Sequence, residues 1–180
     1  GSMKPTIIEG DRVWVNKLAY DIRIPFTDIS IMRISNPERG DIVTFDSGPA
    51  DATLIKRVIG LPGDILEMSN NSLYINGKPA TYKIKKYDIN STLVEEDLNG
   101  FKHMIKISVP STRLSSFGPL KVPENKYFVL GDNRNNSADS RVYGFIPRHE
   151  FRGRSQLVIM SLNYENFYFP RTTRFFKELL

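Results

Sequence analysis

The stretch Ser72-Leu-Tyr-Ile-Asn-Gly-Lys-Pro-Ala-Thr-Tyr-Lys-Ile-Lys85 places an Asn-Gly pair between two strand-like runs. Both central residues of a two-residue hairpin turn need positive φ angles, which Asn and Gly adopt at low cost. We therefore predict a β-hairpin with its turn at Asn76 and Gly77 and its strands at 72–75 and 80–85.

Similar short runs extend in both directions from this hairpin. Apolar or alternating segments recur between Gly, Pro, Asn and Asp residues, whereas helical periodicity is scarce. This pattern predicts a mainly β protein with little helix. The further expected strands are 12–16, 41–45, 53–59, 65–68, 102–108, 127–130, 142–146 and 156–162.

The composition changes between residues 66 and 124. This segment is rich in Lys, Asn and Ser and carries an acidic cluster at 95–97. We expect residues 66–124 to form a smaller β-rich subdomain, inserted into a discontinuous core of residues 1–65 and 125–166.

The tail at 167–180 mixes aromatic and basic residues, a combination suited to a membrane interface. An equally good interpretation is that these aromatic residues cover the protein core.

The composition excludes several classes of protein. Of the 180 residues, 40% are hydrophobic and 25% are charged, which is typical of a globular chain. There is no cysteine, which excludes a disulfide framework, a thiolate nucleophile and a cysteine-ligated metal. A formal charge of +5 leaves nucleic acid or an acidic membrane surface open as a partner. No apolar run approaches the roughly 18 residues of a membrane-spanning helix, so we do not expect the chain as given to span a membrane.

A lysine lies inside the strand-like run at 53–60. Alternation places Leu54, Lys56 and Val58 on one strand face. The ordinary interpretation is an edge strand whose lysine prevents aggregation. The alternative is a buried lysine whose pKa falls by roughly 2 or more from about 10.4, so that its amine can act as a base near neutral pH.

A neutral lysine requires a nucleophile to deprotonate, and without cysteine the candidate is a hydroxyl group. Ser2 is selected because a rigid, turn-forming stretch and a strand-like run follow it. The alternative is that Gly1-Ser2-Met3 remains from a cleaved purification tag.

A dense polar loop spans residues 131–147. It could be an ordinary surface loop with satisfied turns. Buried polar groups must be paired, however, so Asp132, Asp139 and Arg141 could build a rigid network beneath a site. Ser137 could then hold the lysine amine by a hydrogen bond.

Four blocks, in the same order, resemble the bacterial type I signal peptidases, the membrane-bound Ser-Lys endopeptidases that remove signal peptides from exported proteins. The blocks are 2–6 with 10–11, 39–45, 56–64 and 131–147.

The resemblance implies a coiled antiparallel β-sheet catalytic core and a role for each matching residue. Ser2 is similar to the nucleophile and Lys56 to its general base. Ser137 is similar to the serine that orients the lysine. The residues that resemble the ion-paired braces of the site are Asp132, Asp139, Arg57 and Arg141.

The same resemblance implies that the substrate adds as a strand to an enzyme edge and is cut after small residues in an Ala-X-Ala pattern. Candidates for this edge and its pockets are Met3, Pro5, Ile7 and the strand around Lys56. No metal or cofactor is expected. The expected partners are signal-peptide-bearing pre-proteins and a membrane surface, without nucleic acid. The expected location is the bacterial cytoplasmic membrane, with the catalytic domain on the extracytoplasmic side.

The chain departs from the family pattern in three places. The family's oxyanion-hole hydroxyl, two residues before the nucleophile, falls beyond Gly1. Family members normally carry one or more membrane anchors before the nucleophile, so we expect the chain to be a truncated form. Asn135 stands where many relatives have Asp, a change expected to matter little.

Other functions remain open. A Ser-Lys peptidase of conjugative transfer or a self-cleaving repressor would share the dyad on a similar fold. A non-catalytic basic β-barrel module would instead bind nucleic acid or membrane and show salt-dependent binding.

Overall fold

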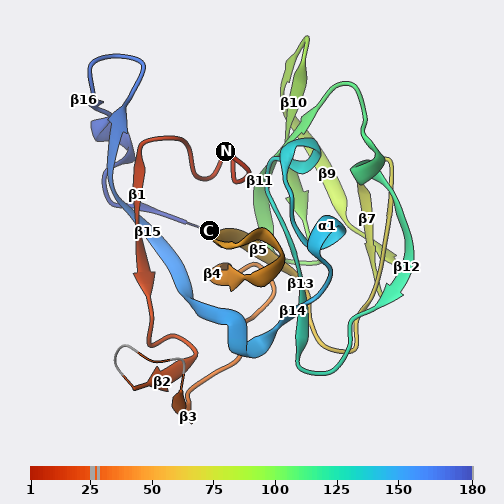
Figure 1. Cartoon of the computed structure of the whole chain (residues 1–180). Coiled ribbons are helices and arrows are strands. Elements are labelled where there is room, and N and C mark those ends of the chain that lie inside the picture. Colours follow the sequence, from red (N-terminus) through yellow and green to blue (C-terminus); the bar gives the residue numbers. More distant parts are fainter. Residues whose placement is uncertain (25–26, 28, 180) are drawn as a thin grey trace.

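The protein is described here by a computed structural model covering residues 1–24, 27 and 29–179. A large antiparallel sheet lies on one side of the molecule (Figure 1). Its longest strand, β15 (Phe151–Asn163), pairs with four others. The order of the sheet is β1 (Asp11–Asn16), β15, β4 (Ile42–Ser47), β5 (Ala52–Gly60), β13 (Lys126–Leu130) and β14 (Ile146–Pro147), with β16 (Phe169–Pro170) and β17 (Lys177–Glu178) also on β15.

Three smaller antiparallel sheets complete the fold. Two come from the middle of the chain and lie on the other side of the molecule (Figure 1). The first has the strand order β12 (Phe117–Lys121), β6 (Ile65–Ser69), β7 (Ser72–Ile75) and β8 (Lys78–Pro79). The second has the order β11 (Lys102–Ser108), β10 (Ser91–Asp97) and β9 (Thr81–Asp88). The third pairs β2 (Asp21–Arg23) with β3 (Ser30–Arg33). The expected mainly β fold, built from antiparallel sheets, is confirmed.

The predicted turn is present. Asn76 and Gly77 have φ angles of 52° and 76°, which join β7 directly to β8 in a two-residue turn. The second strand differs from the prediction, because the hairpin partner is the short β8. The chain then continues into β9, which belongs to another sheet.

The expected strand at 142–146 is wrong. Residues Ser140–Tyr143 form the short helix α1, because the Asp139 side chain accepts a hydrogen bond from the Arg141 amide and caps the helix. Only Ile146 and Pro147 of this region are paired, in β14.

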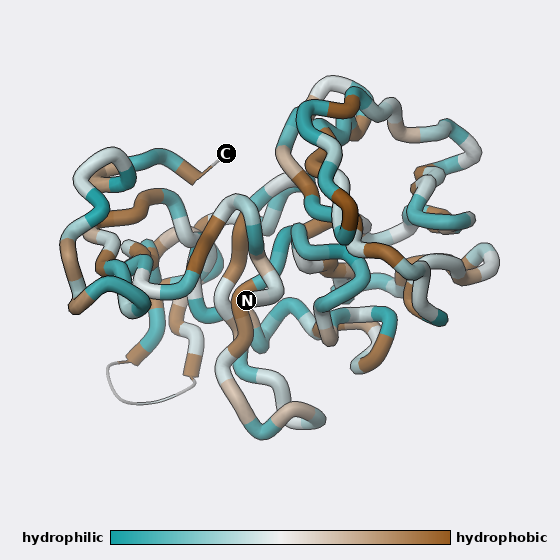
Figure 2. Tube along the Cα trace, turned by 90° about the horizontal axis from the view of Figure 1, so that it is seen from above, coloured by the Kyte–Doolittle hydropathy of each residue, from teal (hydrophilic) through white to brown (hydrophobic). Residues whose placement is uncertain are grey.

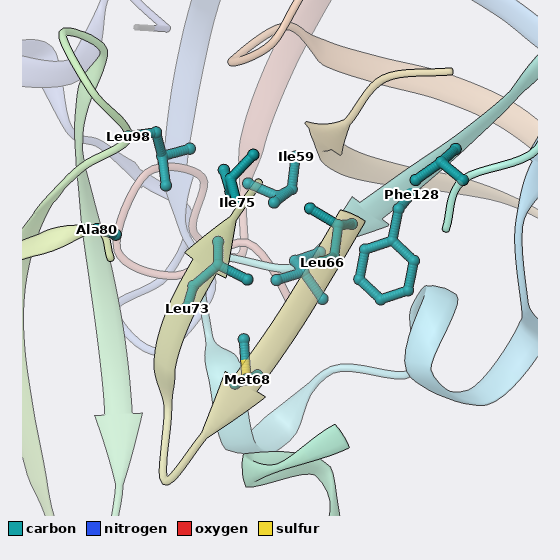
Figure 3. Packing of buried hydrophobic residues seen from close by; sticks show 10 residues of the cluster. Ile59, Leu66, Met68, Leu73, Ile75, Ala80, Leu98 and Phe128 are labelled. Atoms are coloured by element: carbon teal, nitrogen blue, oxygen red, sulfur yellow. The ribbon is translucent and has the colours of Figure 1, made fainter. Parts of the chain in front are cut away.

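The middle of the chain shares its apolar core with the large sheet. Figure 3 shows Leu66, Leu73 and Ile75 packed with Ile59 of β5 and Phe128 of β13. The further buried members of this cluster are Met68, Ala80, Leu98, Val122 and Leu130. This cluster joins residues on both sides of the expected boundaries at 65/66 and 124/125. The expected division into a core of 1–65 with 125–166, an inserted subdomain of 66–124 and a tail of 167–180 therefore stays a prediction.

Strand β5 lies between β4 and β13 in the large sheet. Lys56 is buried, so the interpretation of it as an exposed edge lysine that prevents aggregation is wrong. β4 pairs with β5 from Ala52 to Arg57 on one side. On the other side β13 pairs only from Arg57 to Gly60. The half of β5 that precedes Arg57 therefore has one edge without a strand partner among the described residues.

The N-terminal segment lies between the two halves of the molecule (Figures 1 and 2). Met3 is buried with Ile42 and Val158 of the large sheet, and Ile7 packs against the same cluster. Along the trace in Figure 2, polar and apolar stretches alternate, as half-buried strands require. This placement brings the beginning of the chain to β5.

Candidate active site

Ser2 and Lys56 meet in the structure. Lys56 Nζ lies 2.8 Å from Ser2 Oγ, and it also donates a hydrogen bond of 3.1 Å to the Ile55 carbonyl. The two residues are far apart in the sequence, so the meeting depends on the docking of the N-terminal segment against β5. The predicted nucleophile and base therefore have the geometry that proton transfer requires.

Lys56 is 3% exposed. Desolvation lowers the pKa of its ammonium group, although the Asp139 carboxylate acts in the opposite direction. A lowered pKa increases the fraction of neutral amine near neutral pH. Burial of its side chain thus gives Lys56 the property of a base.

Arg57, the next residue, forms a fully buried ion pair with Asp132. Its Nε and Nη2 atoms each donate a hydrogen bond of 2.9 Å to the carboxylate, and Nη1 donates one of 2.8 Å to the Gly40 carbonyl. Thr6 Oγ1 donates to the same carboxylate. The pair therefore ties β5, the polar loop and the N-terminal segment together.

Asp139 and Arg141 form a second buried ion pair. Arg141 Nη2 donates a hydrogen bond of 2.7 Å to the Asp139 carboxylate, which also accepts one of 3.0 Å from the Gly131 amide. Arg141 further donates to the carbonyls of Leu114 and Arg134. All four expected bracing residues are thus paired in the structure.

Gly131 lies where the polar loop approaches the nucleophile. A Cβ atom at this position would collide with Ser137 Oγ and with the Ser2 carbonyl oxygen. Ser137 is therefore close to the main chain of Ser2. Its buried Oγ makes no hydrogen bond within the described chain, so an orienting bond from Ser137 to Lys56 stays a prediction.

The main chain of the nucleophile is held by the same loop. The Asn133 amide donates a hydrogen bond of 2.9 Å to the Ser2 carbonyl. The Ser2 amide itself donates to none of the residues placed in the structure, and it is available for an oxyanion.

The three expected substrate-binding residues differ in accessibility. Met3 is 2% exposed and belongs to the core, whereas Ile7 is half-buried beside it. Pro5 lines two cavities between the N-terminal segment and β10. Their roles in substrate binding stay predictions.

A further buried polar cluster was not predicted from the sequence. Glu96 pairs with Arg134, accepts a hydrogen bond of 2.9 Å from Tyr82 and lies 3.2 Å from His103 Nε2. His103 Nε2 is in turn 4.0 Å from Asp132. Burial lowers the pKa of His103, which favours the neutral imidazole. The cluster connects β9, β10 and β11 to the polar loop behind the site.

A usable signal for this cluster was the alternation in 91–97, where Val94 and Glu96 point inward. The charges of the neighbouring Glu95 and Asp97 concealed it, because three consecutive acidic residues are typical of an exposed segment.

A metal site, a membrane-spanning helix or a large cavity in the described chain would also bear on its function. No group of three or more His, Asp or Glu side chains in it could hold a metal ion. None of its helices is long and apolar enough to cross a membrane. Cavities of about 550 and 800 Å³ lie beside β2, and neither is lined by Ser2 or Lys56.

The chain is similar to known proteins over most of its length. The family model "Signal peptidase, peptidase S26" matches residues 1–160. A signal peptidase I of Pseudomonas fluorescens is 37% identical over 178 residues, covering 89% of this chain and 62% of that protein. The signal peptidase I S of Bacillus subtilis is 37% identical over 163 residues, covering 90% of this chain and 74% of that protein.

A crystal structure of a signal peptidase I from Enterococcus faecalis V583 is 31% identical. It covers 67% of this chain and 97% of its own, with a TM-score of 0.44. The chain thus spans less than two thirds of the Pseudomonas relative.

Proposed function

The chain belongs to the signal peptidase family, peptidase S26, and from this premise we propose that it is a serine endopeptidase that removes signal peptides from exported pre-proteins. One observation carries the proposal: Lys56 Nζ lies 2.8 Å from Ser2 Oγ, in surroundings that lower the lysine pKa. A hydroxyl beside a neutral amine is an activated nucleophile.

In the proposed mechanism, neutral Lys56 accepts the proton of Ser2 as Oγ attacks the carbonyl carbon before the cleaved bond. The Ser2 amide donates a hydrogen bond to the resulting oxyanion. Lys56 then gives the proton to the departing amine, which leaves an acyl group on Ser2. Water attacks this ester while Lys56 again takes a proton, and the proton returns to Ser2 as the acid product leaves.

The bracing residues fix the geometry of this reaction. Asp132 and Arg57 hold the strand that carries Lys56, and Asp139 and Arg141 hold the loop that reaches Ser2. We propose that Ser137 orients the Lys56 amine once a substrate is bound.

The open edge of β5 is the proposed place for the substrate segment before the cleaved bond. It spans Ala52 to Lys56, immediately before the base, and its main-chain groups can add a further strand. Met3 and Ile7 are the proposed neighbours of the small side chains in the Ala-X-Ala pattern, whereas Pro5 faces the cavities beside β10.

We place the protein at the bacterial cytoplasmic membrane, on its extracytoplasmic side. The tail supports a membrane surface as partner, because Phe167, Tyr168, Phe169 and Phe176 are each more than 60% exposed. The other interpretation of the tail also has support, since Leu179 is buried in the core. A conjugative-transfer peptidase, a repressor or a nucleic-acid-binding module is not favoured, given the family.

Cleavage of a peptide bearing an Ala-X-Ala site tests the proposal. We expect site-specific cleavage that rises from pH 7 to 10 and is lost in Ser2→Ala and in Lys56→Ala. Lys78→Ala, which changes an exposed lysine outside the site, should cleave normally. Cleavage that survives Ser2→Ala would exclude Ser2 as the nucleophile.

A further inference from the structure

A cavity of about 250 Å³ lies between the N-terminal segment and the sheet of β9, β10 and β11. Apolar atoms of Pro5, Ile8 and Leu93 form part of its wall. Three lysines and one acid supply its charges. The full lining is Lys4, Pro5, Ile8, Lys86, Asp88, Ser91, Leu93 and Lys106.

Strand register brings two of the lysines together. Lys86 and Lys106 both stand opposite Leu93, one on each neighbouring strand, so the three side chains form a row across one face of the sheet. Neither Lys86 nor Lys106 forms an ion pair with the part of the chain that the structure places. Lys4 differs, because Glu9 lies 2.7 Å from its amine. The cavity is therefore lined by two lysines that have no ion-pair partner there, and by one acid, Asp88.

The cavity is close to the nucleophile. The Ser2 carbonyl accepts a hydrogen bond of 2.9 Å from Asn133, and the Asp132 carbonyl accepts one of 2.8 Å from the Lys106 amide. Lys106 and Asn133 also form a parallel β-bridge. Lys106 is thus separated from Ser2 by one loop segment, and Lys4 follows Ser2 by two residues.

The N-terminal segment separates this cavity from β5. Met3 and Ile7 pack toward the large sheet, together with Ile55, whereas Pro5 and Ile8 line the cavity. The open edge of β5 and the cavity thus lie on opposite sides of the N-terminal segment, which carries Ser2. If the residues before the cleaved bond bind at that edge, those that follow the bond are the ones that would reach the cavity.

We propose that this cavity is a subsite for an acidic side chain in the substrate segment that follows the cleaved bond, with Lys86 and Lys106 as the residues that select it. The inference rests on the proposed peptidase function and adds a preference beyond the small residues before the bond. A glutamate suits the site, because its methylene groups can contact Leu93 while its carboxylate lies between the two amines.

Matched peptides test this subsite. Each carries the same Ala-X-Ala site, and a single Glu, Gln or Lys is moved through the first four positions after it. We expect a higher kcat/KM for Glu than for Gln at one position, by about two- to five-fold for each lysine engaged. The advantage should lie mainly in KM, and it should shrink as salt is raised from 0.05 to 0.5 M.

The variants Lys86→Gln, Lys106→Gln and their combination should remove the preference for Glu and leave the Gln peptide unchanged. Lys78→Gln, on β8 and outside the cavity, should keep it. The unchanged rate on the Gln peptide also shows that the variants are folded.

Three outcomes overturn the subsite. The first is an equal rate for Glu and Gln peptides at every position. The second is a preference that persists in the double variant. The third is that the double variant loses binding to phosphatidylglycerol vesicles with no change in peptide preference, which would assign the lysines to a lipid headgroup. Failure to cleave even the Gln peptide would instead overturn the peptidase function itself, so the two failures are distinguishable.

Discussion

Lys56 and Arg57 are consecutive residues of β5 whose buried side chains engage different partners. Lys56 reaches Ser2, whereas Arg57 reaches Asp132. Successive side chains of a strand point to opposite faces, so a single strand supplies the base to the site on one face and the brace on the other. A shift of β5 by one residue would exchange the two cations, and the register of the sheet is therefore part of the catalytic geometry.

Burial of Lys56 should give the stability of the protein a pH dependence. The lysine pKa is lowered in the folded state by desolvation, so the unfolded chain binds more protons in the window between that lowered pKa and about 10.4. Stability should rise with pH across this window. Lys56→Met should flatten the rise and stabilise the protein at pH 7, by about 1.4 kcal/mol for each unit of pKa depression. Urea unfolding between pH 7 and 10 measures it, and an unchanged slope in Lys56→Met would contradict it.

Asp132→Asn should be strongly destabilising. It leaves the fully buried Arg57 without its carboxylate, and breaking a buried pair costs about 3–5 kcal/mol. Asp46→Asn is a suitable control, because Asp46 pairs with Arg152 at the surface and its loss should cost less than about 1 kcal/mol. Equal midpoints of urea unfolding for the two variants would refute the proposed bracing role.

Gly131→Ala should reduce activity more than stability. The added methyl group collides with Ser137 Oγ and the Ser2 carbonyl, which must move together with the nucleophile. We expect a loss of about 100-fold in kcat with about 1–3 kcal/mol of destabilisation. Gly118→Ala provides the comparison, because nothing lies within 4 Å of a Cβ atom there. A Gly131→Ala enzyme with normal kcat would show that the loop does not position Ser2.

The ionised Glu96 carboxylate should contribute to the stability of the fold at neutral pH and lose this contribution in acid. Burial by itself would raise the pKa of Glu96, but Arg134 and His103 hold it well below its ordinary value. Its contribution to stability is complete above the unfolded pKa, near 4.3, and is lost as the pH falls below it. Glu96→Gln should therefore unfold more readily at neutral pH and show a flatter loss of stability from pH 5 to pH 2. Glu67→Gln, at an exposed position of β6, should behave as the parent protein.

The exposed aromatic residues of the tail should mediate binding to a membrane. Replacing both Phe167 and Phe169 with Ser should weaken co-sedimentation with anionic lipid vesicles and leave cleavage of a soluble peptide unchanged. Tyr87→Ser, which changes an exposed aromatic residue of β9, tests whether any surface aromatic has this effect. Vesicle binding that is equally strong in the double variant would assign the tail to another role.

The parts of the fold that follow from local chemistry were predictable. The turn at Asn76 and Gly77 needs only its own backbone preferences, and β5 follows from its run of apolar and β-branched residues. The error at 142–146 was also local, because the helix-capping potential of Asp139 was outweighed by the apolar residues that follow it.

The site was only partly predictable, because its contacts depend on tertiary packing. The expected ion pairs of Arg57 and Arg141 are present, and so is the approach of Lys56 to Ser2. The interpretation of Lys56 as an exposed edge lysine failed because its burial depends on the N-terminal segment, which is distant in the sequence. The link from Glu96 to His103 and Arg134 joins three distant segments, which no spacing within the sequence indicates.

The hydrogen bond from Asn133 to Ser2 has a consequence for the order in which the protein becomes competent during synthesis. Ser2 is synthesised before Asn133, the residue that fixes its backbone, which follows it by 131 positions. Contacts of such long sequence separation form late in folding. The nascent chain therefore carries the Ser2 hydroxyl without this backbone contact until the polar loop at 131–147 has been translated.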